Sequence, residues 1–96
     1  MANVSIEREE VNGVHEFVLR MDGARVGFLE FTRLGVGVMQ IEYVEVEPAL
    51  RGAGLGRQLV EKAVAFANET GLRVVPLCPY ARSVIQGDAS LAASLL

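Results

Sequence analysis

The sequence has very little cysteine, histidine and tryptophan. Its 96 residues include one cysteine, Cys78, one histidine and no tryptophan. A single cysteine excludes a disulfide within the chain, so nothing in the sequence requires an oxidising compartment. One cysteine and one histidine also argue against a thiolate or imidazole metal cluster within one chain, and we expect no metal.

Long apolar runs and an excess of positive charge are also missing. No apolar stretch approaches the roughly 18 residues that a membrane-spanning helix needs. Charged residues within 1–10 stand where a signal peptide would have its apolar part. We therefore expect a soluble, cytoplasmic protein without a membrane partner. The net charge of −3 disfavours a nucleic-acid partner, because phosphate binding relies on basic residues.

The chain has enough apolar sequence for one core. It is 51% hydrophobic and 22% charged, and it contains no repeat and no low-complexity tract. These features predict one domain over residues 1–96, in which 87–96 is a weakly specified tail.

The first half of the chain predicts antiparallel strands. Runs rich in strand-forming residues cover 14–20, 24–33 and 36–47. Asp22-Gly23 separates the first two runs, and this pair is typical of a tight hairpin. The three runs therefore predict a meander.

The third run changes phase near its end. Its apolar residues fall at odd positions up to Tyr43 and at even positions from Val44. A strand alternates faces with a period of two, so an inserted residue, a β-bulge near 43–44, would explain the change. A strand end that is covered on both faces would explain it without a bulge.

The second half predicts a helix, a strand and a shorter helix. Apolar residues at helical spacing cover 55–70, and Gly71 follows as a helix-terminating glycine. Residues 72–77 read as a strand buried on both faces, in which Pro76 should end the pairing. Together with the third strand they predict a βαβ crossover. The fold class is thus α/β (α+β): a mixed sheet, one main helix and a short C-terminal helix at 80–86.

The segment RGAGLG, residues 51–56, lies just before the main helix. It lacks the Gly-Lys-Ser/Thr of a Walker A loop, and Arg57 stands where a dinucleotide-binding fingerprint needs its third glycine. A third interpretation is a pyrophosphate site, since bare N–H groups at a helix N-terminus favour an anion and glycines let it approach. A simple tight turn is the remaining alternative.

The segments YVEVEPALRGAGLG (43–56) and VPLCPY (75–80), with the helix between them, resemble the GNAT superfamily, specifically its small YjdJ-type N-acetyltransferase-like branch. The resemblance covers most of the chain. It implies a truncated GNAT-like fold that binds acetyl-coenzyme A (acetyl-CoA), with the pantetheine arm between two splayed parallel strands. The cofactor-binding residues expected on these grounds are Val44, Val46, Arg51, Gly52, Ala53, Gly54, Leu55, Gly56 and Arg57.

Acetyl transfer to an amine requires a base for the amine and a proton for the leaving thiolate. Glu42, Glu45 and Glu47 are candidate bases, of which we select Glu45. Tyr80 resembles, in its placement, the tyrosine with which many GNAT enzymes protonate the leaving sulfur. Cys78 should lie near the thioester, as a contact, a mixed-disulfide partner or a nucleophile.

We therefore expect an acetyl-CoA-dependent N-acetyltransferase in which an amine acceptor attacks directly. The alternatives are a non-catalytic acyl-CoA sensor and a protein-interaction module. The chain is too short for both the helix pair and the hairpin that build the acceptor pocket of full-size GNAT enzymes. It also has residues 86–90 where the small branch usually carries a basic, His-Pro-containing segment. A homodimer whose second subunit completes the site is one expected solution.

Overall fold

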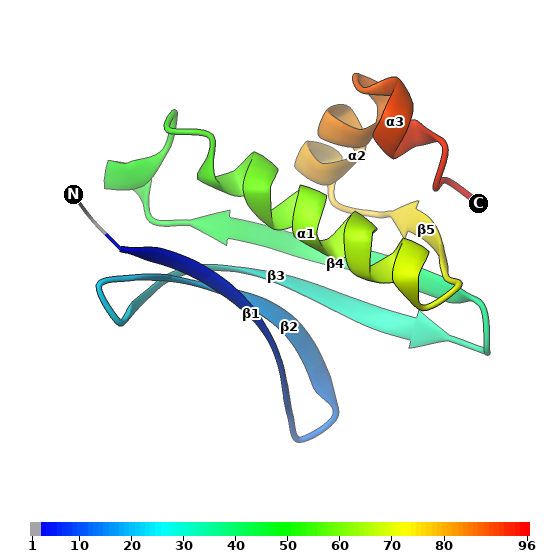
Figure 1. Cartoon of the computed structure of the whole chain (residues 1–96), viewed down its shortest axis with the longest axis horizontal. Coiled ribbons are helices and arrows are strands. Elements are labelled where there is room, and N and C mark those ends of the chain that lie inside the picture. The colour runs from blue at the N-terminus through cyan, green and yellow to red at the C-terminus, as the bar shows by residue number, and fades with distance from the viewer. Residues whose placement is uncertain (1–2) are drawn as a thin grey trace.

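The computed structural model describes residues 3–96 and shows a five-stranded sheet with helices on one face (Figure 1). The strands are β1 (Val4–Val11), β2 (Val14–Met21), β3 (Ala24–Leu34), β4 (Val38–Val46) and β5 (Arg73–Pro76). They lie in the sheet in chain order; β1 to β4 are antiparallel and β5 pairs with β4 in parallel. The predicted meander, crossover and mixed α+β class are confirmed.

Two tight hairpins connect β1, β2 and β3. Asn12-Gly13 and Asp22-Gly23 both have positive φ at both residues, as a two-residue type I′ turn requires. The second hairpin was predicted, whereas β1 was not. Charged side chains dominate β1, and Ile6 packs against the core as one of its few apolar residues. The Asn-Gly pair was the signal that could have revealed β1.

The predicted bulge in β4 is present and is centred on Glu42. Ile41 pairs with Phe31 and Tyr43 pairs with Glu30, so Glu42 has no partner residue on β3. The buried positions of β4 change from odd to even numbers across this residue. The alternative, a strand end covered on both faces without a bulge, is therefore excluded.

The helical elements are the 3₁₀ turn η1 (Pro48–Leu50) and the helices α1 (Leu55–Glu69), α2 (Pro79–Gln86) and α3 (Ala89–Ala92). α1 matches the predicted main helix to within one residue, and Gly71 follows it with φ of 74°. α2 begins one residue before the predicted short helix. α3 was not predicted.

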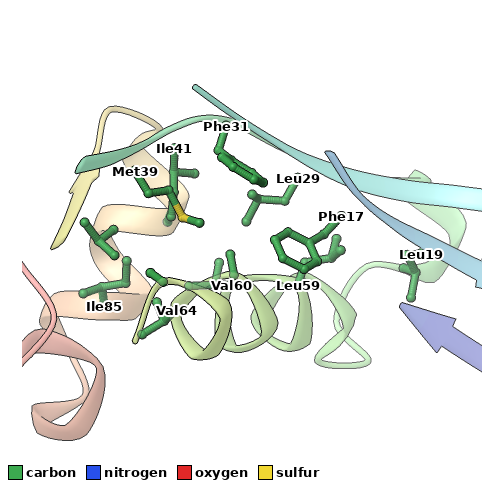
Figure 2. Packing of buried hydrophobic residues seen from close by; sticks show 14 of the residues in the cluster. Phe17, Leu19, Leu29, Phe31, Met39, Ile41, Leu59, Val60, Val64 and Ile85 are labelled. Atoms are coloured by element: carbon green, nitrogen blue, oxygen red, sulfur yellow. The ribbon is translucent and has the colours of Figure 1, made fainter. Parts of the chain in front are cut away.

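α1 and α2 share one core with the sheet. Figure 2 shows Phe17, Leu29 and Phe31 of β2 and β3 directed toward α1. The buried stripe of α1 consists of Leu55, Leu59, Val60, Ala63, Val64 and Ala67. Ala81 and Ile85 bring α2 into the same cluster. Burial of this continuous apolar surface is the main source of stability.

The expectation that residues 72–77 are buried on both faces is wrong. Val74 is buried, Val75 is half-buried and Leu77 is 46% exposed. Helices cover only one face of the strand (Figure 1), and the exposed Arg73 lies between the buried Leu72 and Val74.

The C-terminal tail, residues 87–96, contacts the rest of the domain near both of its ends. The Asp88 carboxylate accepts hydrogen bonds from the N–H groups of Ser90 and Leu91 and caps α3, and it also pairs with the Arg57 guanidinium. Leu95 then forms a parallel bridge to Val74. These contacts give the tail a defined course over α1 and β5.

Leu59→Ala should lower the free energy of unfolding by about 2–5 kcal/mol, because the substitution leaves a cavity at a fully buried side chain. Gln58→Ala, next to it on the exposed side of α1, should change stability by only about 0.5 kcal/mol. Urea unfolding followed by circular dichroism measures both. Equal losses would contradict the assigned helix face.

Asp88→Asn should destabilise the protein at neutral pH and progressively less in acid. The hydrogen bond from the Ser90 hydroxyl, then those from main-chain N–H groups and the charge of Arg57, lower the pKa of Asp88 in the folded chain. The carboxylate therefore stabilises the fold above the unfolded-chain pKa of about 4, and this contribution is lost as pH falls through the folded-state pKa. Urea midpoints measured over a pH series test this; a difference from wild type that stays constant into acid would refute it.

Candidate functional site

β4 and β5 separate at one point in the sheet. Their parallel pairing runs from Val38 opposite Arg73 to Ile41 opposite Pro76 and then ends. On β4 the bulge begins directly after Ile41, and the two strands diverge just beyond this pair.

The pairing was expected to end because Pro76 lacks an N–H, and this reason is wrong. The N–H groups of Arg73 and Leu77 donate to carbonyls of β4 or of the residue just before it, whereas that of Val74 donates to Ser94. Alternate residues of β5 thus face β4, and position 76 is directed to the other side.

The chain after β5 turns away from β4 at the same place. The N–H groups of Leu77 and Cys78 both donate to the Ile41 carbonyl, with N···O distances of 3.0 and 3.3 Å. Cys78 is the N-cap residue of α2, so these hydrogen bonds also determine where α2 begins. The end of β4 beyond the bulge is left without a neighbouring strand on this side.

The last residues of β4 present main-chain groups toward the resulting gap. The Glu47 N–H donates to the Val26 carbonyl on β3 (2.9 Å). Because successive residues of an antiparallel strand bond to opposite sides, Val44 and Val46 direct their N–H and C=O groups away from β3. The Arg51 side chain confirms this direction, since its Nε donates to the Val46 carbonyl at 3.1 Å.

The glycine turn lies at the end of this open edge. Gly52 and Gly54 have φ of 90° and 81°, a left-handed conformation that favours glycine. A Cβ atom built on either glycine would meet no atom within 4 Å. Gly54 is the N-cap of α1, and the first turn of this helix carries no acidic side chain. The space beside Gly52 and Gly54, at the positive end of the helix dipole, is thus open.

These elements enclose one cleft of about 490 Å³. The described residues that line it are Val44, Glu45, Val46, Leu50, Arg51, Gly52, Gly54, Leu55, Gly56 and Tyr80. The tertiary structure thereby brings most of the residues predicted from the sequence into one place. Leu50 was missed, although an apolar residue between Pro48 and the glycine turn was a usable signal.

Three of the predicted site residues, Ala53, Arg57 and Cys78, are outside the set of described residues that line the cleft. The Arg57 guanidinium donates to Glu61 and Asp88. The Cys78 side chain is half-buried and packs against the core cluster beside the strand separation. Their roles in cofactor binding or chemistry stay predictions.

The candidate bases differ in their surroundings. Glu45 lines the cleft, its side chain is 59% exposed, and one carboxylate oxygen lies 3.8 Å from Nη2 of Arg51. Glu42, the bulge residue, is half-buried at the strand separation and accepts a hydrogen bond of 2.6 Å from Nε2 of Gln40. Glu47 is exposed and lies outside the described lining of the cleft.

Residues 16–94 match the sequence profile of the family described as GCN5-related N-acetyl-transferase, or GNAT. The chain belongs to this family. Its assignment to the small YjdJ-type branch of the GNAT family stays a prediction.

The chain is similar to an uncharacterised N-acetyltransferase of Methanocaldococcus jannaschii, with 33% identity over 67 residues. The match covers 64% of this chain and 30% of that protein, so the chain spans under a third of the length of this curated relative.

Two solved structures share the GNAT fold. The IAA acetyltransferase of Bacillus cereus superimposes with a TM-score of 0.72 at 18% identity, over 88% of this chain and 75% of that one. The GNAT family N-acetyltransferase YhbS of Escherichia coli, solved in complex with CoA, superimposes with a TM-score of 0.62 at 28% identity. That match covers 71% of this chain and 43% of YhbS.

Within residues 3–96, no helix has the length and hydropathy to cross a membrane. Over the same residues, no group of three or more histidine, cysteine, aspartate or glutamate side chains is arranged to hold a metal ion.

Proposed function

We propose that this GNAT domain binds acetyl-CoA in the cleft at the end of β4 and transfers the acetyl group to an amine that attacks directly. Family membership supports the reaction class, and the complex of YhbS with CoA supports the cofactor. One observation carries the proposal: the glycine turn, the open edge of β4 and Tyr80 line the same cleft.

The glycine turn fits a pyrophosphate. The space next to Gly52 and Gly54 is open, and the first-turn N–H groups of α1 have no acceptor within the helix. An anion there would gain hydrogen bonds together with the favourable end of the helix dipole. With no acidic side chain in the first turn of α1, that potential is not cancelled locally.

The open edge of β4 fits the amide groups of a pantetheine arm. Main-chain groups of Val44 and Val46 point into the cleft, so an extended chain can bond to them as an added strand would. The Val46 carbonyl already accepts from Arg51. When the cofactor enters, Arg51 either keeps its hydrogen bond to this carbonyl or releases it. If Arg51 releases the carbonyl, its guanidinium can bind the phosphates.

The proposed reaction includes two proton transfers, one from the amine and one to the departing sulfur. Acetyl-CoA supplies the acetyl group as a thioester; the acceptor nitrogen forms the new C–N bond as the C–S bond breaks. Glu45 takes the proton that the amine loses, with Glu42 as the alternative base. The Tyr80 hydroxyl donates a proton to the departing sulfur, and a β4 N–H stabilises the carbonyl oxygen as it gains charge. Cys78 lies beside the sulfur as a contact.

CoA should raise the Tm of the protein. A ligand at 100 times its Kd stabilises the folded state by about 2.7 kcal/mol, which corresponds to roughly 13 °C for a domain of this size. Gly54→Val should abolish the rise, because its side chain fills the space proposed for the phosphates. A thermal-shift titration measures both.

Gly71→Val is the matched control, since Gly71 has φ of 74° and open space at the other end of α1. Both substitutions strain a left-handed residue by roughly 1–2 kcal/mol, but the response to CoA should survive only in Gly71→Val. An undiminished response in Gly54→Val would remove the glycine turn from the site.

Acetyl-CoA should release its thiol in the presence of a suitable primary amine. Tyr80→Phe should lower kcat by roughly 100-fold or more if the hydroxyl is the proton donor, and Cys78→Ala should retain activity if the thiol is only a contact. A thiol-detection assay over a panel of amines provides the measurement. Tight CoA binding without turnover on any amine would instead indicate a non-catalytic acyl-CoA sensor.

A further inference from the structure

Gly56 differs from the other two glycines of the turn. It is the second residue of α1, and its φ is not positive. Neither a left-handed backbone nor a cap therefore requires glycine here. Glycine at a helical position costs roughly 1 kcal/mol relative to alanine. Apart from the close approach of a phosphate, a contact within the protein accounts for a glycine here.

The contact is with Tyr80. A Cβ atom on Gly56 would lie 2.9 Å from the Tyr80 hydroxyl oxygen and 3.1 Å from the ring atoms Cε2 and Cζ. Real Cβ atoms essentially never come as close as the first of these distances. The phenol thus lies over the first turn of α1, directly against the bare face of Gly56.

We propose that Gly56 is a positioning residue for Tyr80: its missing side chain lets the phenol lie across α1 with the hydroxyl in the cleft. The role of that hydroxyl as a proton donor rests on the proposed function. The packing of the phenol against Gly56 is independent of it. Both residues line the same cleft.

An alanine at 56 should move the tyrosine and leave the fold intact. Tyr80 is 46% exposed, and the atoms in closest contact lie at the free end of its side chain. Ala81 and Ile85 bury α2 in the core, so the ring swings away more easily than the helix shifts. Gly56→Ala should therefore preserve or raise Tm by improving the helix.

The kinetic test separates chemistry from binding. Gly56→Ala should lower kcat roughly 10- to 100-fold, as expected for a displaced proton donor, and change the KM for acetyl-CoA by only a few-fold. In a Tyr80→Phe background the same substitution should cause no further loss of kcat. Gly37→Ala, at a glycine with open space and no positive φ, is the control and should match wild type.

A spectroscopic test needs neither cofactor nor turnover. The chain has two tyrosines and no tryptophan, so Tyr43→Phe leaves Tyr80 as the only source of the tyrosine band in near-ultraviolet circular dichroism. Adding Gly56→Ala should change this band, and adding Gly37→Ala should not. The far-ultraviolet spectrum should stay the same in all three proteins.

The outcomes distinguish the two proposals. An unchanged tyrosine band with unchanged kcat overturns the positioning role. An unchanged band with weakened binding of CoA also overturns it and assigns Gly56 to the phosphates alone. A changed band in a protein that binds CoA and acetylates no amine supports the positioning role and overturns the proposed acetyl transfer.

Discussion

The separation of β4 from β5 after Ile41 is the constraint on which the site depends. A parallel pair normally continues until one strand ends, and the backbone groups of both strands are then satisfied by each other. Here the bulge at Glu42 falls at the level of the sheet where β5 ends and the chain turns into α2. The bulge redirects β4, and the turn, in which Leu77 and Cys78 both donate to the Ile41 carbonyl, carries the segment after β5 away from it.

The edge exposed by this separation carries main-chain groups that need hydrogen-bond partners. Main-chain N–H and C=O groups that lose a strand partner must bond to water, to side chains or to a ligand. Arg51 provides one such bond to the Val46 carbonyl. This hydrogen bond therefore links the glycine turn to the end of β4, and both of these line the cleft. A flexible cation suits this place because it can exchange one oxygen partner for another.

The three glycines of residues 51–56 serve two physical purposes. Gly52 and Gly54 allow a left-handed backbone, and their open surroundings leave the helix N-terminus accessible. Gly56 makes room for an aromatic ring from another element. One short segment therefore sets the shape of the end of the cleft where we propose that the phosphates bind and, through Tyr80, the position of a hydroxyl group in the cleft.

Local signals in the sequence predicted much of this fold. The phase change in β4 indicated the bulge within two residues, and Gly71 indicated the end of α1. Each signal acts through neighbouring backbone geometry, which a short window of sequence contains. β1 was missed, although Asn12-Gly13 is a typical hairpin signal. β1 lies at the edge of the sheet, and its charged residues hide the apolar alternation of a strand.

The sequence by itself thus determined the order of the elements from β2 to α2, the bulge and the bare helix N-terminus, since these follow from local dihedral preferences and apolar periodicity. Only the tertiary structure decided which side chains far apart in the sequence meet. Arg57 pairs with Asp88, 31 residues away, and the phenol of Tyr80 lies against Gly56. Such contacts depend on how α2 and the tail dock on the core, and no local pattern records that geometry.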